Sequence, residues 1–376
     1  MLRPLKIGVV CYPTFGGSGI IATELGKGLA DRGHEVHFIT YSKPVRMDLF
    51  TENMFYHEVS VIDYPLFEYA PYELLLSSKM VDVAITQGLD LLHVHYAIPH
   101  ASAAYSAQQI LKTKNIHLPF ITTLHGTDIT LLGKDKSYQP VIEFAINQSN
   151  AVTAVSQSLK KDTYSFFNIK KDIEVIPNFI DFDLFQKHEY SYLRQNYAQD
   201  DEVILTHISN FRKVKRVVDV LYIFERVQQK KAAKLLLVGD GPEIENLRKE
   251  TQVLGLEQKV HFLGKSHRIE QITAISDILL LPSEAESFGL VALEAMGAGV
   301  AIISSNVGGL PEVNVEGKTG FLRPVGDIEA MAQAALMILK DKPTLERFKQ
   351  NAIQHSKKFD IKYVLPLYEK LYRSLT

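Results

Sequence analysis

Cysteine is nearly absent from this chain of 376 residues, which contains one, Cys11. A single cysteine excludes a disulfide within the chain and suits the reducing cytosol. Because Cys11 lies at the end of an apolar run, we expect a small buried side chain rather than a nucleophile.

Strong charge and long apolar runs are lacking as well. The net charge is −2, which gives no electrostatic reason to expect nucleic-acid binding. No stretch approaches the roughly 18 uninterrupted apolar residues of a membrane-spanning helix, and no signal peptide is visible. We therefore expect a soluble, cytoplasmic protein without stable membrane association. The number of subunits stays open, and a homo-oligomer is among the alternatives.

Short apolar runs alternate with helical patterns along the whole chain. Such an alternation predicts parallel sheets that are covered by helices on both faces. The expected fold class is therefore α/β, with two Rossmann-like, doubly wound domains facing a central cleft. The expected strands are Leu5–Cys11, Glu35–Thr40, Leu91–His95, Phe120–Leu124, Ala151–Val155, Val203–Ile208, Leu235–Val238, Val260–Leu263, Ile278–Leu281 and Val300–Ser304.

A proline and an asparagine interrupt this pattern midway, in Val175–Asp181. Such a break suits a linker, so we predict a first domain over residues 1–174 and a second over residues 175–360. The last segment, about 361–376, is predicted to be an amphipathic helix with apolar side chains at Tyr363, Leu367 and Leu371. Since no strand follows it, we expect this helix to join the first domain.

A glycine-rich segment, Pro13–Gly19, follows the first strand and opens into a helix. Gly17, Gly19 and Ala22 match the G-x-G-x-x-A spacing of dinucleotide sites, so an NAD-dependent oxidoreductase is one alternative. That fingerprint needs an acidic residue after the second strand to bind the ribose, and Phe38–Lys43 contains none. The glycines would still let backbone amides approach an anion closely.

Polar side chains gather where two neighbouring strands end. His93, His95 and His100 belong to or follow one strand, while His125 and Asp128 follow the next. A metal site is one interpretation of this group. No glutamate accompanies the His-x-His pair, however, and a proline precedes His100. Side chains that line a ligand cleft are therefore the favoured interpretation.

In the second half, four cations fall within the five positions Arg212–Arg216, just after a strand. Diphosphate and carboxylate substrates both need such concentrated positive charge, so we expect an anion site here. Gly239 lies in a glycine turn after the next strand. Asp181 and Asp183 formally match an Asp-x-Asp metal motif, but they lie in the linker rather than at a strand end.

Two glutamates, Glu286 and Glu294, lie eight residues apart across the start of a helix. At a rise of about 1.5 Å per residue, their carboxylates can lie on the order of 12 Å apart. That is roughly the reach from a hexose to a ribose across a diphosphate, and the helix N-terminus between them favours phosphate. One helix could thus hold both ends of a nucleotide-sugar, although two solvated glutamates would show the same spacing.

Taken together, these motifs resemble the retaining glycosyltransferases of family 4, which have the GT-B fold, and the resemblance covers nearly the whole chain. Three segments further resemble the branch of this family that begins bacillithiol synthesis: Cys11–Gly19, His93–His100 and Asn210–Arg216. In one departure, Asn210 stands where family members usually carry an arginine. The marks of the family are Gly16–Gly17, Leu92–His95, His125–Gly126, Ile176–Asn178, Lys215, Val238–Pro242, Glu286–Glu294 and Gly308–Glu312.

The resemblance implies UDP-N-acetylglucosamine as donor, L-malate as acceptor, retention of the α-anomeric configuration, and neither a cofactor nor a metal. It implies that Glu294 binds the ribose, Glu286 a hydroxyl of the transferred sugar, and Lys215 the diphosphate. The implied catalytic residues are His125, Glu286 and Lys215. The implied donor-binding residues are Gly16, Gly17, Asn210, Lys215, Arg216, Gly239, His267, Glu286, Ser287, Phe288, Gly289, Leu290 and Glu294, and the implied acceptor-binding residues are Gly17, Ser18, Tyr96, Thr127, Asn210 and Arg212.

The expected chemistry differs from that of retaining glycosidases, which use two carboxylates about 5 Å apart. No carboxylate pair in the sequence is placed for that role. We therefore expect a same-face displacement in which the departing phosphate helps to take the acceptor's hydroxyl proton.

Two further alternatives stay open. Ser158–Phe167 mixes lysines with aromatic residues, as helices that touch anionic membranes do, so a family 4 enzyme with a lipid or another sugar acceptor is one of them. Acidic residues intervene in that segment, which favours a solvated surface helix. A non-catalytic nucleotide-sugar sensor is the other.

Overall fold

The computed structural model describes residues 3–14, 16–47, 51–60, 69, 71–131, 133, 135–186, 188–266 and 268–376. The chain divides into two units: unit 1 comprises Met1–Asn178 and Ile361–Thr376, and unit 2 comprises Phe179–Asp360. The division falls after Asn178, inside the segment predicted as a linker, whereas the predicted domains meet between residues 174 and 175.

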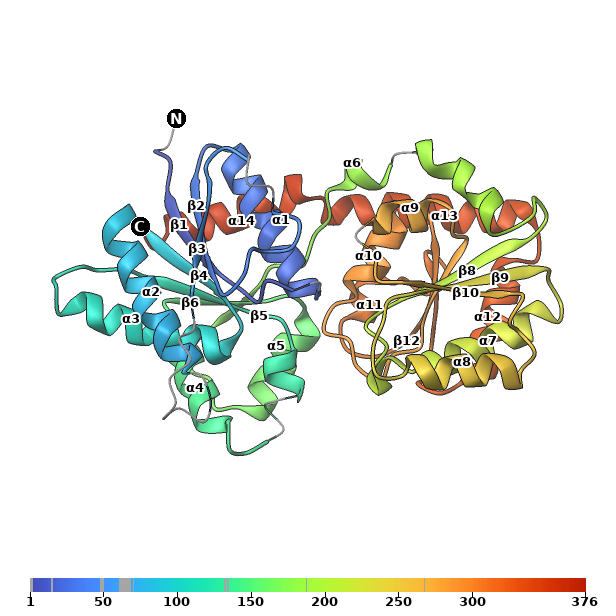
Figure 1. Cartoon of the computed structure of the whole chain (residues 1–376), viewed down its shortest axis with the longest axis horizontal. Coiled ribbons are helices and arrows are strands. Elements are labelled where there is room, and N and C mark those ends of the chain that lie inside the picture. The colour runs from blue at the N-terminus through green and yellow to red at the C-terminus, as the bar shows by residue number, and fades with distance from the viewer. Residues whose placement is uncertain are drawn as a thin grey trace. The chain divides into compact units, whose positions relative to one another are not determined.

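Unit 1 contains a seven-stranded sheet with helices on both of its faces (Figure 1). All strand pairs are parallel, in the order β3-β2-β1-β4-β5-β6-β7. The strands are β1 Lys6–Val10, β2 Glu35–Thr40, β3 Met54–Glu58, β4 Leu91–His95, β5 Phe120–Leu124, β6 Ala151–Ala154 and β7 Ile173–Val175. The helices are α1 Gly17–Asp31, α2 Tyr72–Gln87, η1 Ala97–Ala101, α3 Ser102–Lys112, η2 Thr127–Leu131, α4 Gln139–Gln148, α5 Gln157–Phe166 and α14 Ile361–Arg373.

Unit 2 repeats this architecture with a six-stranded parallel sheet in the order β10-β9-β8-β11-β12-β13. The strands are β8 Val203–Ile208, β9 Ala233–Val238, β10 Val260–Gly264, β11 Ile278–Leu281, β12 Ala301–Ser305 and β13 Gly320–Arg323. The helices are α6 Phe182–Phe185, η4 His188–Asn196, η5 Lys213–Lys215, α7 Val217–Gln228, α8 Ile244–Val253, α9 Ile269–Ala274, α10 Leu290–Gly297, α11 Leu310–Val313, α12 Ile328–Ile338, α13 Lys342–Ser356 and η6 Lys357–Phe359.

The buried face of α14 differs from the prediction. Tyr363 and Leu367, predicted on the apolar face, are 66% and 41% exposed. The buried side chains are instead Val364, Leu365, Tyr368 and Tyr372, one position further along the chain. Two stripes of apolar and aromatic residues run along this helix one position apart, so helical spacing alone does not show which of them is buried. α14 packs against α1 within unit 1, where a Cβ on Gly28 would lie 2.8 Å from Ile361.

Each sheet has one switch point, where the strand order reverses direction. It lies between β1 and β4 in unit 1 and between β8 and β11 in unit 2. Open parallel sheets bind ligands outside the carboxyl ends of the strands at such points. The segments that follow these four strands contain most of the predicted site residues, and His125, Thr127 and Gly239 follow the neighbouring strands β5 and β9.

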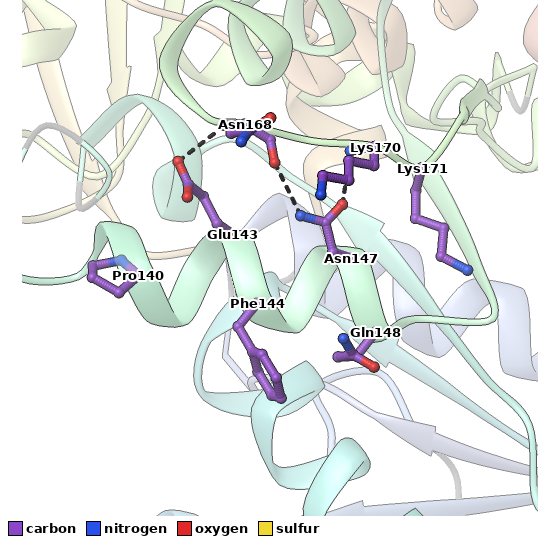
Figure 2. A pocket seen from close by; sticks show the side chains of 8 residues that line it. All are labelled: Pro140, Glu143, Phe144, Asn147, Gln148, Asn168, Lys170 and Lys171. Atoms are coloured by element: carbon purple, nitrogen blue, oxygen red, sulfur yellow. Dashed lines mark hydrogen bonds between the residues drawn. The ribbon is translucent and has the colours of Figure 1, made fainter.

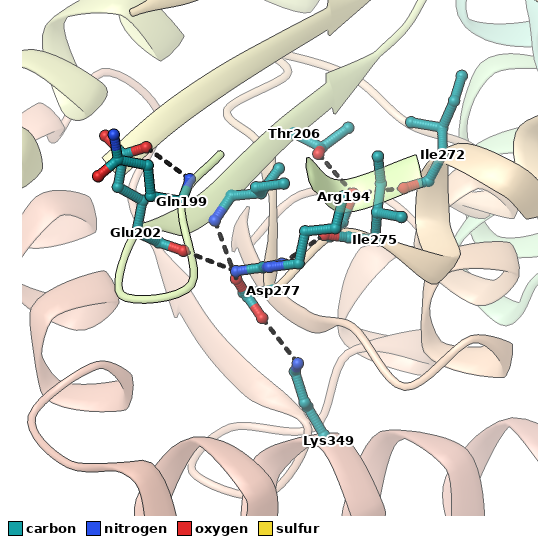
Figure 3. A network of polar contacts seen from close by, with 10 residues as sticks. Arg194, Gln199, Glu202, Thr206, Ile272, Ile275, Asp277 and Lys349 are labelled. Carbon is teal, nitrogen blue, oxygen red and sulfur yellow. Dashed lines mark hydrogen bonds and ion pairs between the residues drawn. The ribbon is translucent and has the colours of Figure 1, made fainter. Parts of the chain in front are cut away.

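A buried ion network ties the opposite end of the unit 2 sheet together (Figure 3). Asp277 precedes β11 and is 4% exposed. Its carboxylate accepts from Arg194 of η4 at 2.8 Å, from Lys349 of α13 at 2.7 Å and from the Ile204 amide of β8 at 2.9 Å. These contacts hold the starts of β8 and β11 together, and so help to position the opposite ends of both strands, where the site is predicted.

Candidate active site

The loop between β1 and α1 brings backbone amides to the switch point of unit 1. Gly16 is the N-cap of α1, and its carbonyl accepts from the Gly19 amide at 3.0 Å. By helix geometry, the amides of Gly17 and Ser18 precede the first intrahelical bond. A Cβ on Gly19 would lie 2.4 Å from the Thr14 carbonyl oxygen, so the tight turn requires glycine there. This helix end can therefore receive an anion.

Tyr96 follows β4 and connects that helix end to the neighbouring strands. Its hydroxyl donates to Ser18 Oγ at 2.7 Å, and the Thr127 side chain interacts with the same phenol. Burial raises the pKa of Tyr96 to about 12, so the phenol is neutral. Its backbone has φ 86°, a region that costs a non-glycine residue on the order of 1–3 kcal/mol. Three residues predicted for the acceptor, Ser18, Tyr96 and Thr127, thus lie together.

Three histidines stack where β4 and β5 end. The ring centroids of His93 and His95 are 4.5 Å apart, and those of His95 and His125 are 5.0 Å apart. His95 Nδ1 lies 2.7 Å from His125 Nε2, while His93 bonds Tyr372 and Thr123, each at 2.7 Å. Burial lowers the pKa of His93 and of His125 to about 3, so both rings are neutral at physiological pH.

The carboxylate of Asp128 accepts hydrogen bonds from two backbone amides. One oxygen accepts from the Ala97 amide at 2.8 Å, and the other from the Gly126 amide at 3.1 Å. Asp128 therefore ties the segment after β4 to the segment after β5, a role that the sequence pattern did not indicate. In the described parts of the chain, no cluster of three or more His, Cys, Asp or Glu side chains is arranged to hold a metal ion. His93, His95, His100 and Asp128 are fully buried, so they support the strand ends rather than line a cleft as expected, whereas His125 is 9% exposed.

Two of the cations after β8 are paired with carboxylates of unit 2. Lys215 Nζ donates to Glu286 Oε1 at 2.5 Å. Arg216 donates to Asp219 at 2.6 Å and to Glu284 at 3.0 Å. The side chain predicted for the diphosphate, Lys215, thus holds the carboxylate predicted for the sugar. Arg216, also predicted for the donor, has its charge balanced by two carboxylates.

The other two cations of this loop, Arg212 and Lys213, could bind an anionic ligand. Arg212 and Lys213 are exposed, and among the described residues neither forms an ion pair. Asn210, predicted for both substrates, is exposed in the same loop. Beneath it, Gly239 has φ 131°, and a Cβ there would lie 1.8 Å from the Ser209 carbonyl oxygen. Gly239 thus allows the turn after β9 to support the loop after β8.

Glu286 lies in a segment held by glycines. Its carbonyl accepts from the Gly309 amide at 2.9 Å, and a Cβ on Gly308 would lie 1.8 Å from that oxygen. Ser283 donates to the Glu286 carboxylate at 3.3 Å. Sequence reasoning missed Ser283, although its position just after β11, at a switch-point strand, was a usable signal.

α10 begins at Leu290, directly after Gly289, which has φ 95°. Phe288 is buried against the rest of unit 2, and Ser287 and Leu290 are partly buried. Glu294 is 4% exposed, so it is not a solvated surface glutamate. His267 lies outside the described residues.

A surface cavity of about 540 Å³ lies elsewhere on unit 1, between α4 and the segment that follows α5 (Figure 2). Asn147 holds this segment by bonds to the Asn168 carbonyl at 3.0 Å and the Lys170 amide at 2.8 Å. Glu143 accepts from the Asn168 amide at 2.9 Å. The cavity contains none of the predicted site residues.

Two family models match the chain, one on each half. The model described as Glycosyltransferase Family 4 matches residues 15–184, and that described as Glycosyl transferases group 1 matches residues 191–355. A relative from Bacillus anthracis, N-acetyl-alpha-D-glucosaminyl L-malate synthase, is 47% identical over 98% of this chain and 96% of its own. The chain belongs to glycosyltransferase family 4. It is therefore a glycosyltransferase, and the oxidoreductase alternative is set aside.

More distant glycosyltransferases agree with this assignment. An uncharacterised glycosyltransferase of Methanocaldococcus jannaschii is 29% identical over 82% of each chain. The crystal structure of Anabaena HepE in complex with UDP and glucose superposes with a TM-score of 0.82 at 22% identity, over 98% of this chain and 100% of that one. This family 4 glycosyltransferase thus has the predicted GT-B fold. No helix within the described ranges has the length and apolar character needed to cross a membrane.

Proposed function

We propose that this glycosyltransferase moves N-acetylglucosamine from UDP-N-acetylglucosamine to the hydroxyl of L-malate and releases UDP. The 47% identity to the Bacillus anthracis enzyme, along nearly the full length of both chains, supports this choice of substrates. Within the structure, the supporting observation is the carboxylate of Glu286, held by Lys215 and Ser283 beside the start of α10. A carboxylate can accept a hydrogen bond from a sugar hydroxyl, and the cation beside it can bind the attached diphosphate.

The donor would bind along α10. Glu294 would accept hydrogen bonds from the ribose, Glu286 would accept one from the sugar, and the first amides of α10 would receive the diphosphate. The diphosphate and Glu286 are both anions, so an arriving donor would compete for Lys215. Lys215 would then offset the negative charge that grows on the leaving group.

The acceptor would bind to residues that form no ion pair within the described chain: those around the start of α1, and Arg212 in the loop after β8. The amides of Gly17 and Ser18, with the hydroxyls of Tyr96 and Thr127, would bind one carboxylate of malate. Arg212 would bind the other, because its planar guanidinium matches a carboxylate in two hydrogen bonds. The proposed donor residues belong mainly to unit 2, and the residues proposed for the first malate carboxylate belong to unit 1.

The reaction would be a same-face displacement with retention. The bond between the sugar C1 and the β-phosphate oxygen breaks, the malate hydroxyl oxygen bonds to C1, and its proton goes to the departing phosphate oxygen. This route needs no carboxylate nucleophile. The positive charge it requires is supplied by Lys215 and the start of α10, with no metal assigned a role.

Release of UDP from UDP-N-acetylglucosamine would be measured with L-malate, lactate and other small hydroxy acids, and the anomeric configuration of the product read by NMR. We expect malate to be the best acceptor and the product to be the α-anomer. UDP release that malate does not increase would contradict the proposed acceptor. A β-linked product would contradict retention but not the proposed donor and acceptor.

A further inference from the structure

His125 is the only member of the stacked histidine row that reaches the surface within the described structure. It is 9% exposed, whereas His93, His95 and His100 are fully buried. Its Nε2 is already engaged, 2.7 Å from His95 Nδ1. The nitrogen that remains to contact a substrate is therefore Nδ1. Whether Nδ1 donates or accepts depends on which of the two rings supplies the shared proton.

The surroundings of His95 decide this question. His95 Nε2 is buried and has no hydrogen-bond partner in the described structure. If His125 supplied the shared proton, His95 Nδ1 would accept it and the proton of His95 would sit on the unpartnered Nε2. A buried N–H group without an acceptor is rare and costly. The favoured arrangement has His95 Nδ1–H donating to His125 Nε2, which leaves a proton on His125 Nδ1.

The His95 ring is also fixed in orientation. It lies between two nearly parallel rings, with interplanar angles of 26° to His93 and 24° to His125. His93 is itself held through both nitrogens, by Tyr372 and Thr123. A turn of the His95 ring that exchanged its two nitrogens would therefore break the bond to His125 and disturb its packing between two rings.

We infer that His95 is a positioning residue that holds His125 as a neutral Nδ1–H donor aimed at the substrate. The role of His125 on the sugar rests on the proposed function, whereas the tautomer does not. A neutral donor can hydrogen-bond an oxygen of the sugar without competing with Lys215 for the diphosphate charge. Burial lowers the pKa of His95 as well, which keeps the pair neutral.

Two substitutions separate the hydrogen bond from the packing. In His95→Asn the side-chain amide N–H takes the place of Nδ1–H, whereas His95→Leu keeps the bulk and loses the donor. We expect His95→Leu to lower kcat by about tenfold to a hundredfold, since small misplacements of an active-site group have effects of this size. Its affinity for UDP should stay within about twofold of the wild type, because His95 belongs to unit 1. His95→Asn should recover most of the loss.

NMR of the protein with ¹⁵N-labelled histidine provides a readout that does not depend on activity. In the wild type, His125 should show a protonated Nδ1 and an unprotonated Nε2, and this state should be lost in His95→Leu. His125 protonated at Nε2 in the wild type, or a His95→Asn enzyme as slow as His95→Leu, would overturn the inference. If malate and UDP-N-acetylglucosamine proved not to be substrates, the proposed function would fail, but the NMR result would still decide the tautomer.

Discussion

Glu286 and Glu294 are the same residue type in very different surroundings, and this difference predicts different effects of their loss. Glu294 is buried in α10, whereas Glu286 is held by Lys215 and Ser283. If Glu294 binds the ribose, Glu294→Ala should weaken UDP and UDP-sugar binding alike, by about 1–3 kcal/mol. Glu286→Ala should instead mainly lower turnover; it should not weaken UDP binding, because its loss frees Lys215 for the diphosphate. Calorimetry with UDP measures the first effect and steady-state kinetics the second.

A control for this comparison is Glu245→Ala, which removes an exposed glutamate from the first turn of α8. It should change neither quantity by more than the error of measurement, since exposed charges away from a site contribute little. A Glu294→Ala variant that binds UDP as tightly as the wild type would remove Glu294 from the ribose.

Arg212 is predicted to select a dicarboxylate. It is exposed and forms no ion pair within the described residues, so its guanidinium is available to the acceptor. Arg212→Ala should raise the KM for malate strongly, by about tenfold or more for a lost charged hydrogen bond. UDP affinity should change little. Lactate, which lacks the second carboxylate, should be a poor acceptor for the wild type, and the preference for malate should shrink in the variant.

The neighbouring Lys213→Ala is the matched control, because Lys213 is exposed and unpaired in the same described loop. If Lys213→Ala reduces the malate preference and Arg212→Ala does not, the second carboxylate belongs to Lys213 instead.

Tyr96→Phe tests the contact between the phenol and the start of α1. The substitution removes the hydroxyl that donates to Ser18 and keeps the ring, which lies 5.3 Å from both Tyr12 and His125. Loss of one such hydrogen bond should raise the KM for malate by an amount worth about 1 kcal/mol, with little change in UDP affinity. An unchanged KM for malate would place the acceptor away from Tyr96.

At the scale of whole elements, the sequence predicted the interior of both sheets and missed part of their edges. The central strands are rich in apolar and β-branched residues because both of their faces are buried, and β2, β4, β5, β8 and β11 have the predicted bounds. β3, β7 and β13 were not predicted. Each is an edge strand with few buried positions, so its sequence lacks the apolar run on which the prediction depended.

The site was predicted in the same uneven way. Strand ends and glycine turns pointed to its segments, because glycines such as Gly239 and Gly308 leave a clear mark in the sequence. Contacts between distant side chains left no such mark. The pairing of Lys215 with Glu286 and the bracing role of Asp128 arise from topology, which brings separate strand ends together.

The network around Asp277 predicts how firmly the elements of unit 2 are joined. Burial alone would raise the pKa of Asp277, but the charges of Lys349 and Arg194 outweigh it and lower that pKa. Asp277→Asn should reduce the free energy of unfolding by about 3 kcal/mol, because it leaves two cations without their buried partner. Urea denaturation measures this loss, which should be full above the ordinary carboxyl pKa of 3.8 and should diminish as the pH falls through the lowered pKa of folded Asp277.

A surface ion pair provides the comparison for that variant. Asp172 is 91% exposed and pairs with Lys160 at 3.3 Å. Asp172→Asn should change the free energy of unfolding by less than about 0.5 kcal/mol. Equal effects of the two substitutions would show that the Asp277 network adds no more than a surface pair.

At the scale of the whole molecule, buried neutral histidines make both units sensitive to acid. Burial lowers the pKa of His93 in unit 1 to about 3 and that of His207 in unit 2 to about 4, from an ordinary value of 6.5. The unfolded chain therefore binds protons below pH 6.5 that the folded chain does not. The stabilisation is fully present above pH 6.5 and is lost as the pH falls toward these lowered values, by about 1.4 kcal/mol per pH unit for each such histidine.

His207→Asn should make the free energy of unfolding less dependent on pH, because the variant lacks one of the groups that bind a proton on unfolding. His207 Nδ1 bonds the Leu280 carbonyl at 2.7 Å, and an asparagine amide can donate to the same oxygen without titrating. Urea denaturation at pH 7 and pH 5 should show a smaller loss of stability for the variant, with the difference close to 2 kcal/mol, or about 1.4 kcal/mol for each pH unit below 6.5. The variant is expected to be less stable at pH 7, because it gives up the His207 bond to Ser209. Parallel losses in both proteins would mean that His207 already takes up its proton in the folded state, and its burial would then not be a source of the acid sensitivity.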